Sequence, residues 1–466
     1  MVGITTVAPK NWRFSHEQRS VTLRFAEDFI AVSGVQRETA GLQRAELVFV
    51  GYGIKAPEYQ WDDFKDFDCR GKVLVFLNND PDWDPQLFAG STRLYYGRWS
   101  YKYEMAAELG AAGAVIIHTT PSAGYPWPVV VNSWTGTQFE LPQGSEPRIQ
   151  LKGWVTEPAA KKLFALAGLD LAKLVEKAKS RDFRPVPTGI VTSLNLQNRL
   201  SQVTGANILG ILPGSDPTKA QEFVVVSAHY DHLGIGRPDH RGDVIYNGAR
   251  DNAAGCAQVL AIARALAALP TRPARSILVA FFDAEESGLL GSTYLASHMP
   301  VPPGRVAAVV NYDGGNIFGK TRDVAQVGRH KSSLDRILDQ EAARQGRVVI
   351  PDPFLDRGSF YRSDHFSLAR VGIPGLYFKA GVEFLGRPEG WGRAQAEAWE
   401  AQHYHRPSDE LTDDWDFSGL VEDAELGLAC VVAIANEEEL PFWHDGDEFS
   451  PARAKALAEL GEAKER

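Results

Sequence analysis

The sequence is poor in cysteine, and this shortage excludes a disulfide-rich scaffold. The 466 residues include only three cysteines, Cys69, Cys256 and Cys430. Three thiols cannot form the several cross-links on which such scaffolds depend. Cys256 lies in an alanine-rich stretch, where we interpret it as a small buried apolar residue. The low count by itself leaves the redox compartment open.

Long apolar runs and an excess of positive charge are also absent. A membrane-spanning helix needs roughly 20 apolar residues, whereas the longest runs here, such as 223–228 and 276–282, have the length of strands. The net charge of −10 argues against nucleic acid or an anionic membrane as the main partner. No signal peptide is apparent after Met1. We therefore expect a globular protein without a membrane span.

The first half of the chain predicts one α/β unit. A chain of 466 residues is long for a single hydrophobic core, so two or three domains are expected. The apolar runs at 45–53, 71–79 and 114–120 are typical of strands. Between the last two, residues 100–113 predict a helix that ends on glycine. A further helix is expected over 157–179.

From about Asn207 a second alternation of strands and helices begins. Strands separated by helices favour a mostly parallel sheet with helices on both faces, and in such sheets a site forms at the carboxyl ends of the strands. The fold class is therefore α/β. The expected elements are strands 223–228, 276–282 and 306–312, helices 253–269, 287–298 and 331–345, and a terminal helix 449–461.

Acidic and imidazole side chains cluster where these strands end. The clusters read S-A-H-Y-D-H-L-G (227–234), G-A-R-D-N-A-A-G (248–255), F-F-D-A-E-E-S-G (281–288), V-V-N-Y-D-G-G (309–315) and H-Y-H-R-P-S-D (403–409). Their carboxylates and imidazoles are the ligands that a pair of divalent metals needs. The sequence therefore predicts a metal centre at this edge of the sheet.

Each member of these clusters has an ordinary explanation when it is taken alone. A single histidine or aspartate after a strand is more often structural than a ligand. The pair Glu285 and Glu286 would suit the positive end of a helix dipole. Taken together the carboxylates would repel one another in one crevice unless cations held them. Asp231 lies close to His229 in sequence and is a natural acceptor for the second imidazole nitrogen.

These motifs resemble the zinc aminopeptidase/glutamate carboxypeptidase family of di-zinc exopeptidases, including the bacterial leucyl aminopeptidases. The resemblance runs from Asn207 to Glu437, with the motifs in the family's order. It implies a di-zinc exopeptidase fold and two Zn²⁺ per chain. It also implies a cis peptide bond after Asp251.

The resemblance also implies a role for each motif residue. His229 and Asp313 would bind one zinc, Glu286 and His405 the other, and Asp251 would bridge both. Glu285 would be the general base and Tyr404 would stabilise the oxyanion. The residues concerned are His229, Asp251, Glu285, Glu286, Asp313, Tyr404 and His405, with Asp231 supporting His229. A peptide would be the substrate.

The segments G-K-V-L-V-F (71–76) and E-L-G-A-A-G-A-V-I-I (108–117) resemble a protease-associated domain. The expected organisation is a segment 1–40 packing on the catalytic domain, a protease-associated-like domain over 41–190 and the peptidase domain over 191–466. The family likeness implies an exported protein, periplasmic or secreted. The sequence does not indicate an oligomeric state.

Three further histidines are expected to be secondary. His232 is interpreted as a residue of the second shell or the surface, and His365, with Asp364, as a supporting residue. His403 would alternate with His405 on an extended piece and point the other way.

Two other enzyme classes have partial signals in the sequence. Residues 314–321 read G-G-N-I-F-G-K-T, which matches the phosphate-binding loop of ATPases. The residues after Thr321 predict a strand, however, whereas that loop must open a helix. A serine hydrolase is excluded because Ser363, Asp364 and His365 are adjacent and no G-x-S-x-G elbow is present. A non-catalytic relative would be expected to lack ligands, and here the full set is present.

The substrate end is the remaining question. An aminopeptidase holds an α-ammonium with carboxylates, and a carboxypeptidase or dipeptidase holds an α-carboxylate with arginines. The segment G-L-Y-F-K-A-G (375–381) carries no arginine, which favours an aminopeptidase, while Arg357 and Arg362 keep the alternative open. The tryptophan- and glycine-rich piece 383–402 predicts an insertion that lines or covers the pocket.

Overall fold

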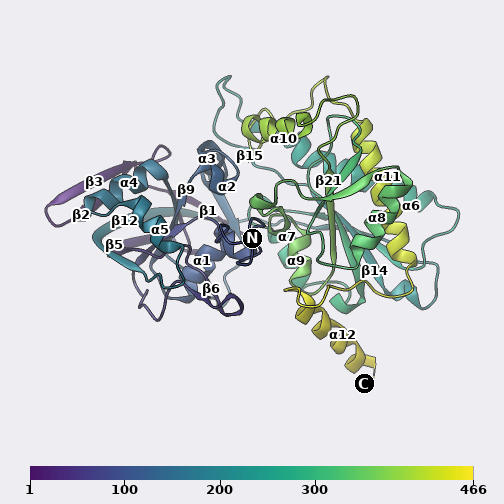
Figure 1. Cartoon of the computed structure of the whole chain (residues 1–466), viewed down its shortest axis with the longest axis horizontal. Coiled ribbons are helices and arrows are strands. Elements are labelled where there is room, and N and C mark those ends of the chain that lie inside the picture. Colours follow the sequence, from purple (N-terminus) through teal and green to yellow (C-terminus); the bar gives the residue numbers. More distant parts are fainter. Residues whose placement is uncertain (465–466) are drawn as a thin grey trace. The chain divides into compact units, whose positions relative to one another are not determined.

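A computed structural model describes residues 1–464, which divide into two compact units. Unit 1 comprises Met1–Thr204 and the short segment Leu355–Tyr361. Unit 2 comprises Gly205–Phe354 and the described residues from Arg362 onward. Figure 1 labels many of the elements of both units.

Unit 1 is built around one ten-stranded sheet. The strand order is β10-β1-β12-β5-β8-β9-β11-β4, and β2 pairs with β12 and β3. The strands are β1 (Val2–Val7), β2 (Asn11–His16), β3 (Arg19–Arg24), β4 (Phe29–Ser33), β5 (Thr39–Phe49), β8 (Val73–Leu77), β9 (Gly113–His118), β10 (Thr137–Glu140), β11 (Leu151–Thr156) and β12 (Val186–Gln202), with a small separate pair β6 (Lys55–Ala56) and β7 (Trp61–Asp62). The helices are α1 (Trp99–Glu108), α2 (Thr120–Ala123), α3 (Trp127–Trp134), α4 (Glu157–Leu166) and α5 (Leu171–Ala178).

The N-terminal segment differs from the expected organisation. Residues 1–40 were expected to pack on the catalytic domain, but they supply β1 to β4 and the start of β5 in the sheet of unit 1. The expected boundary at residue 190 falls inside β12. This long strand pairs with β5, β1 and β2. Hydrophobic runs locate strands but do not show which strands pair, so this part of the sheet was not predictable.

Left-handed glycines account for the helix ends in unit 1. Helix α1 was expected over 100–113 but ends at Glu108, because Gly110 has φ +68° and turns the chain toward β9. The single helix expected over 157–179 is two helices, interrupted at Gly168 with φ +72°. Asp170 caps the second by accepting from the backbone N–H of Ala172 at 2.9 Å.

A fully buried lysine holds the core of unit 1 together. The ammonium of Lys102 on α1 donates to the carbonyl oxygens of Tyr52 at 2.6 Å, Asn79 at 2.9 Å and Tyr96 at 2.6 Å. These three hydrogen bonds satisfy carbonyl groups from the loops that follow β5 and β8 and from the short 3-10 helix Tyr95–Gly97. Charged groups are rarely buried completely unless their hydrogen bonds are satisfied in this way.

We expect Lys102→Met to destabilise unit 1 by about 3 kcal/mol, because it leaves three carbonyl oxygens without a donor. The free energy of unfolding from urea titration measures the effect. Lys161→Met is the matched control, since the Lys161 side chain is 60% exposed and its loss should cost less than about 0.5 kcal/mol. Equal stability of the two variants would contradict the prediction.

Unit 2 contains a seven-stranded sheet in the order β13-β17-β14-β18-β21-β19-β20. Its strands are β13 (Ile208–Leu212), β14 (Phe223–His229), β17 (Ser276–Phe282), β18 (Val306–Tyr312), β19 (Asp323–Val327), β20 (Val348–Pro351) and β21 (Gly375–Ala380), with a hairpin of β15 (Gly234–Ile235) and β16 (Ile245–Tyr246). Its helices are α6 (Gly255–Ala268), α7 (Leu290–Ser297), α8 (Leu334–Arg344), α9 (His365–Ala369), α10 (Trp391–Gln402), α11 (Ser418–Asn436) and α12 (Ser450–Lys464).

The sheet of unit 2 is mostly parallel, which confirms the expected fold class. Strand β14 pairs in parallel with β17 and β18, and β18 pairs in parallel with β21. Only β13 and the β19–β21 pair run antiparallel within it. The parallel arrangement brings the carboxyl ends of β14, β17 and β18 to one edge.

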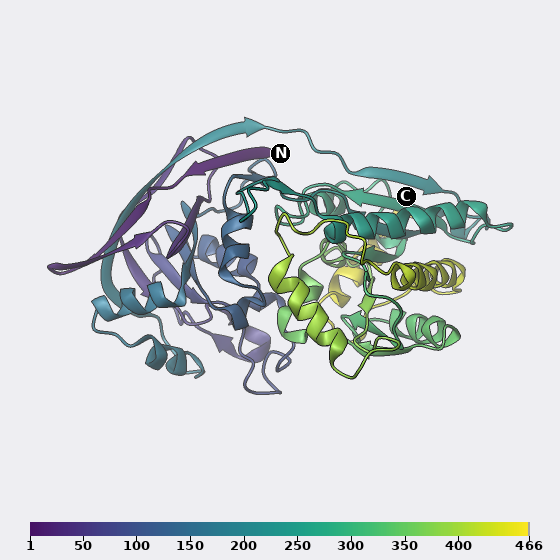
Figure 2. The same ribbon diagram turned by 90° about the horizontal axis from the view of Figure 1, so that it is seen from above.

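Helices cover both faces of this sheet. Successive side chains of a strand point to opposite faces, so Val224 and Val226 of β14 belong to one apolar cluster and Val225 to another. The first cluster includes side chains of α6, α8 and α11, and the second includes side chains of α7 and α9. Figure 2 shows α6 and α11 running side by side. The central strand is therefore buried on both sides.

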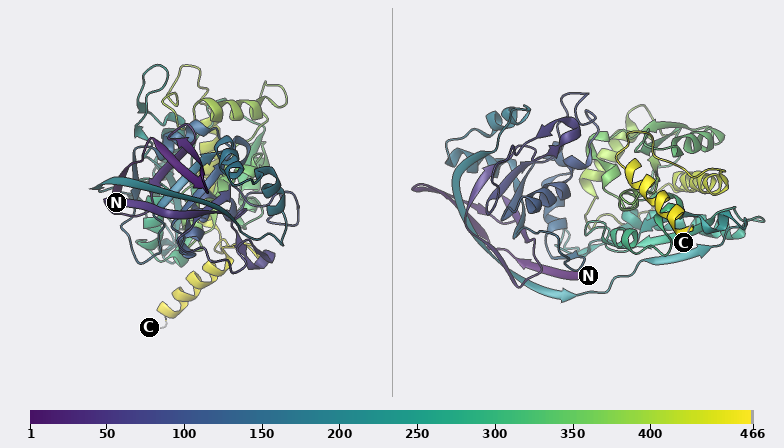
Figure 3. Two further views of the ribbon diagram at one scale, coloured as in Figure 1. Left: turned by 90° about the vertical axis from the view of Figure 1, so that its left-hand side faces the viewer. Right: turned by 90° about the horizontal axis from the view of Figure 1, so that it is seen from below.

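Helix α12 ends the described chain (yellow in Figure 3). It packs on the turn Pro303–Arg305, where a Cβ on Gly304 would lie 2.3 Å from the Ala456 carbonyl oxygen. In the described part of the chain, no helix combines the length and the apolarity needed to cross a bilayer.

Candidate active site

The five predicted metal ligands all lie in unit 2, at or just beyond the ends of secondary-structure elements. His229 is the last residue of β14, Asp313 follows β18, and Glu286 follows β17. Asp251 lies in a short turn before α6, and His405 follows α10. Strand order therefore explains three of the five positions, and two loops bring in the others.

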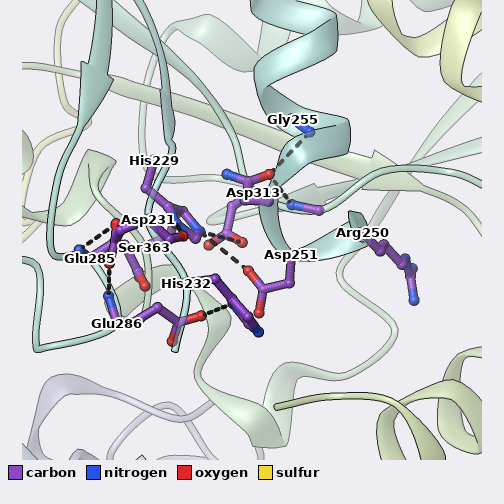
Figure 4. A network of polar contacts seen from close by, with 12 residues as sticks. His229, Asp231, His232, Arg250, Asp251, Gly255, Glu285, Glu286, Asp313 and Ser363 are labelled. Atoms are coloured by element: carbon purple, nitrogen blue, oxygen red, sulfur yellow. Dashed lines mark hydrogen bonds and ion pairs between the residues drawn. The ribbon is translucent and has the colours of Figure 1, made fainter. Parts of the chain in front are cut away.

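These five side chains converge, with Asp251 between the two histidines. Asp251 Oδ1 lies 3.3 Å from His229 Nε2, and its Oδ2 lies 3.6 Å from His405 Nε2. A second carboxylate approaches the same nitrogen of each histidine, with Asp313 Oδ1 3.6 Å from His229 Nε2 and Glu286 Oε2 3.0 Å from His405 Nε2. Figure 4 shows His229, Asp251, Glu286 and Asp313 pointing toward one another. The geometry suits a carboxylate shared by two neighbouring groups.

Asp231 organises the two glutamates as well as His229. Its carboxylate accepts from the backbone N–H of Glu285 at 2.9 Å and of Glu286 at 3.2 Å. It also lies 3.6 Å from His229 Nδ1. Ala284, just before the glutamates, has φ +55°, a left-handed conformation that turns the chain after β17. Asp231 and this turn together aim the glutamates at the cluster.

Asp251 is held by its neighbours through the backbone. The Asp251–Asn252 peptide bond is cis. The Asn252 amide donates to the carbonyl oxygen of Tyr312 at 3.0 Å and accepts from the N–H of Gly314 at 2.9 Å, which ties this turn to β18. Asp409 accepts from the N–H groups of Arg250 at 2.9 Å and Asp251 at 3.1 Å.

Glu285 is a buried carboxyl group beside one half of the cluster. Its side chain can offer an oxygen together with His229 and Asp313, with all ligand atoms within 4.8 Å of one another. Burial raises the pKa of Glu285 well above its usual value, although the charge of His229 opposes this. A carboxylate with a raised pKa is a stronger base, which suits a group that takes up a proton.

The pKa values of Glu286 and His405 are shifted in opposite directions. Burial disfavours ionisation of Glu286, but the imidazoles of His405 and His232 outweigh it and lower the pKa of Glu286 to about 2. Burial likewise disfavours the charged form of His405, but Glu286 and Asp251 raise its pKa to about 10. The carboxylates therefore create a strong demand for positive charge at this point, which a divalent cation can meet as well as a proton can.

The donor set fits zinc. Two groups of three side chains each bring their ligand atoms within 4.8 Å, His229 with Glu285 and Asp313, and His232 with Asp251 and Glu286. Imidazole nitrogen and carboxylate oxygen are ligands that zinc accepts. In the described part of the chain, the buried Nε2 of His229 has no hydrogen-bond partner, although two carboxylates approach it. A cation between these atoms would satisfy all three.

Tyr404 stands where the cluster meets a cavity. Its ring stacks on His405 with 3.9 Å between centroids, and its hydroxyl oxygen accepts from Arg362 Nη2 at 3.1 Å. Burial raises the pKa of Tyr404 well above its usual value, so the hydroxyl stays protonated and able to donate. The cavity, of about 170 Å³, is lined by Asp251, Asp313 and Tyr404 and by side chains of the 383–402 segment. The prediction that this segment lines a pocket is confirmed.

The secondary histidines occupy different surroundings. His232 is buried against the cluster, with Nδ1 2.7 Å from Glu286 Oε1. Asp364 and His365 are fully buried, and burial lowers the pKa of His365 to about 3. His403 caps the end of α10 rather than lying on an extended piece, and its Nδ1 lies 2.9 Å from the Ser408 carbonyl oxygen.

The role of Asp409 was missed from the sequence, although Asp409 lies inside the motif that the sequence singles out for His405. The contact of His232 with Glu286 agrees with one of the two interpretations given to it, a residue that supports a ligand. The glycine-lysine segment 314–321 is followed by β19 rather than by a helix, so it lacks the helix N-terminus that a phosphate-binding loop requires.

Comparison with known proteins supplies independent evidence for unit 2. Residues 207–428 match peptidase family M28. The chain is similar to leupeptin-inactivating enzyme 1 of Streptomyces exfoliatus, at 26% identity over 217 residues, covering 46% of this chain and 45% of that protein. It is similar to aminopeptidase YwaD of Bacillus subtilis at 25% identity over 239 residues, covering 51% of this chain and 46% of the relative. The chain thus spans less than half the length of both relatives.

A solved structure supports the fold of the whole chain. An aminopeptidase from Aneurinibacillus sp. strain AM-1 aligns with a TM-score of 0.52 at 18% identity, covering 94% of this chain and 84% of that one. At this identity the likeness concerns the fold alone.

Proposed function

Because residues 207–428 match the model of peptidase family M28, we propose that the protein is a zinc-dependent exopeptidase that removes the N-terminal residue of peptides. The observation that carries the proposal is the placement of Asp251 between His229 and His405, at 3.3 and 3.6 Å. One carboxylate with each oxygen facing a different histidine is suited to two ions. Some of the similar proteins are named aminopeptidases, which supports the same activity.

We assign His229 and Asp313 to one zinc and Glu286 and His405 to the other, with Asp251 shared. The 3.6 Å approach of Asp313 to His229 and the 3.0 Å approach of Glu286 to His405 support this division. When bound, zinc supplies an activated water and polarises the scissile carbonyl. Asp231 holds His229 and the backbone of both glutamates in place.

We assign the proton transfer to Glu285 and the stabilisation of the oxyanion to Tyr404. Glu285 takes the proton from the attacking water and passes it to the leaving amine. Its burial and raised pKa support this role. Tyr404 donates its hydroxyl hydrogen to the oxyanion, and Arg362, which donates to the Tyr404 oxygen, fixes the orientation of that hydroxyl.

The runner-up is a carboxypeptidase or dipeptidase of the same family. The segment 375–381, whose lack of arginine favours an aminopeptidase, forms β21 and the residue after it. Its one cation, Lys379, lies on the cavity wall. Asp352 and Glu400 line the same cavity and are suited to an α-ammonium. Arg250, also on the wall, is the group that a carboxypeptidase would use.

A turnover panel with added zinc tests the proposal. We expect aminoacyl 4-nitroanilides with a free amino group to be hydrolysed and N-blocked dipeptides to be left intact. Cleavage of the blocked set alone would reassign the enzyme as a carboxypeptidase. If the zinc-loaded protein hydrolyses neither set, the assignment as an exopeptidase is refuted. Chelator-treated protein serves as the blank.

Two wider expectations stay predictions. They are the identification of unit 1 as a protease-associated-like domain and the location of the protein outside the cytoplasm.

A further inference from the structure

The cavity next to the metal cluster has an unusual wall for a site that handles a peptide's end. Its wall includes Asp251 and Asp313 of the cluster and the aromatic side chains Phe318, Phe378 and Trp399. It also carries further charged groups, the carboxylates Asp352, Glu400 and Asp423 and the cations Arg250 and Lys379. Apolar surface beside placed polar groups is typical of pockets that fix the orientation of a ligand. The polar group closest in sequence to the shared ligand is Arg250, the residue before Asp251.

Arg250 is fixed in position from three sides. Its backbone N–H donates to Asp409 Oδ1 at 2.9 Å, and its Nε donates to the Gly315 carbonyl oxygen at 2.9 Å. The guanidinium lies 4.2 Å from the ring centroid of Trp399. Figure 4 shows the Arg250 side chain directed away from the metal cluster while the neighbouring Asp251 points into it. The cation is therefore held rigidly at the cavity wall.

In residues 1–464, the two Nη groups of this guanidinium have no hydrogen-bond partner. Within residues 1–464, no carboxylate forms an ion pair with Arg250, and its hydrogen bonds use the backbone N–H and Nε, not the two Nη groups. Lys379, exposed on the same wall, likewise forms no ion pair in that part of the chain. A planar guanidinium with two Nη groups available matches the geometry of a carboxylate.

We propose that Arg250 receives a carboxylate of the peptide substrate in this cavity, so that the enzyme selects substrates bearing a carboxylate close to the scissile bond. This inference rests on the proposed function, whose metal cluster supplies the neighbouring reaction centre. The carboxylate has two possible sources, the side chain of an N-terminal Asp or Glu and the α-carboxylate of a C-terminal residue. Asp352 and Glu400, on the same wall, would face the ammonium group of such a substrate.

Binding of three small probes tests the proposal without turnover. L-Glutamate carries both carboxylates, L-glutamine only the α-carboxylate, and L-isoglutamine only the side-chain carboxylate. Calorimetry on the zinc-loaded protein should show one mono-carboxylate binding like glutamate and the other about 10- to 100-fold weaker, the range that a charged hydrogen-bond pair provides. If glutamine is the weaker ligand, Arg250 receives the side-chain carboxylate. If isoglutamine is the weaker ligand, Arg250 receives the α-carboxylate. Equal affinities, or binding of none of the three, would overturn the proposal.

The variant Arg250→Met removes the charge and keeps the length of the side chain. It should abolish the preference among the probes and lower kcat/KM on a glutamyl or aspartyl anilide by about 10- to 100-fold, with leucyl anilide changed less than about threefold. If the α-carboxylate is the source, the same loss appears instead on dipeptides with a free amino group, whose C-terminal carboxylate lies one residue from the scissile bond. Arg264→Met, an exposed position on α6, is the matched control and should behave as the parent protein.

The carboxylate site and the exopeptidase activity can be tested independently of each other. A uniform loss on all substrates in Arg250→Met would mean that Arg250 only supports the Asp251 turn, and a preference for lysyl anilide would mean that the acidic residues dominate the wall. Either result overturns this inference and leaves the exopeptidase intact. Probe discrimination that depends on Arg250, in a protein that cleaves no peptide, would uphold the carboxylate site and refute the proposed function.

Discussion

The variant Glu285→Gln is expected to bind zinc as the parent protein does and to turn over its substrate about 10²–10⁴-fold more slowly. Gln keeps the shape of the side chain but cannot accept a proton. Glu285 is 9% exposed, and its backbone N–H is held by Asp231 at 2.9 Å. The exchange therefore removes the base without moving the chain around it.

Two measurements on the same preparation separate this role from that of a ligand. Metal content by emission spectroscopy reports zinc binding, and kcat with a free-amino anilide reports the chemistry. Glu425→Gln, at an exposed position on α11, should match the parent protein in both. Retained turnover in Glu285→Gln would reject Glu285 as the base. Loss of zinc together with turnover would make Glu285 a ligand, a role that its place beside His229 and Asp313 also permits.

Asp251→Asn is expected to have the second large effect, the loss of both metals. The neutral amide is a much poorer ligand, and Asp251 is the one carboxylate that faces both histidines. The loss in zinc affinity should exceed the 10- to 100-fold that removal of a supporting group outside the ligand set costs. Turnover should then fall below detection even with excess zinc.

A graded pair of controls tests the shared position of Asp251. Asp409→Asn, which weakens only the hold on the Arg250 and Asp251 N–H groups, should fall within about 10- to 100-fold of the parent in zinc affinity. Asp413→Asn, at an exposed position, should have no effect. If Asp251→Asn lost one zinc and kept the other at full affinity, Asp251 would belong to a single ion.

Much of unit 2 was predictable because its signals are local. The run Phe223–His229 is buried from Val224 onward, and its β-branched residues predict a strand covered on both faces. Helix α6 was expected over 253–269 and spans Gly255–Ala268. The helix expected at 287–298 begins at Leu290, because Gly288 and Leu289 have φ of +100° and +62°. Helix starts that depend on a left-handed residue carry little periodic signal.

In unit 1, local sequence patterns predict strands but not which strands pair. The strands near 45, 71 and 114 were expected, but β12 pairs with β1 over Val2–Val7 and Gln197–Gln202, residues almost two hundred positions apart. Nothing in either run indicates the other. The burial of Lys102 is similar, because its three carbonyl partners come from segments that only the packed unit brings together.

By itself the sequence determined the fold class and the identity of the chemical groups, since buried strands followed by His229, Asp313 and the glutamate pair are legible in a single pass along the chain. The tertiary structure alone decided which atoms of these groups meet. It set Asp251 between two histidines, brought Asp409 into contact with the Asp251 backbone N–H and placed the Arg250 guanidinium in the wall of the cavity. Strand and helix patterns report the local backbone, whereas these contacts join residues up to about 160 positions apart and depend on how the elements pack.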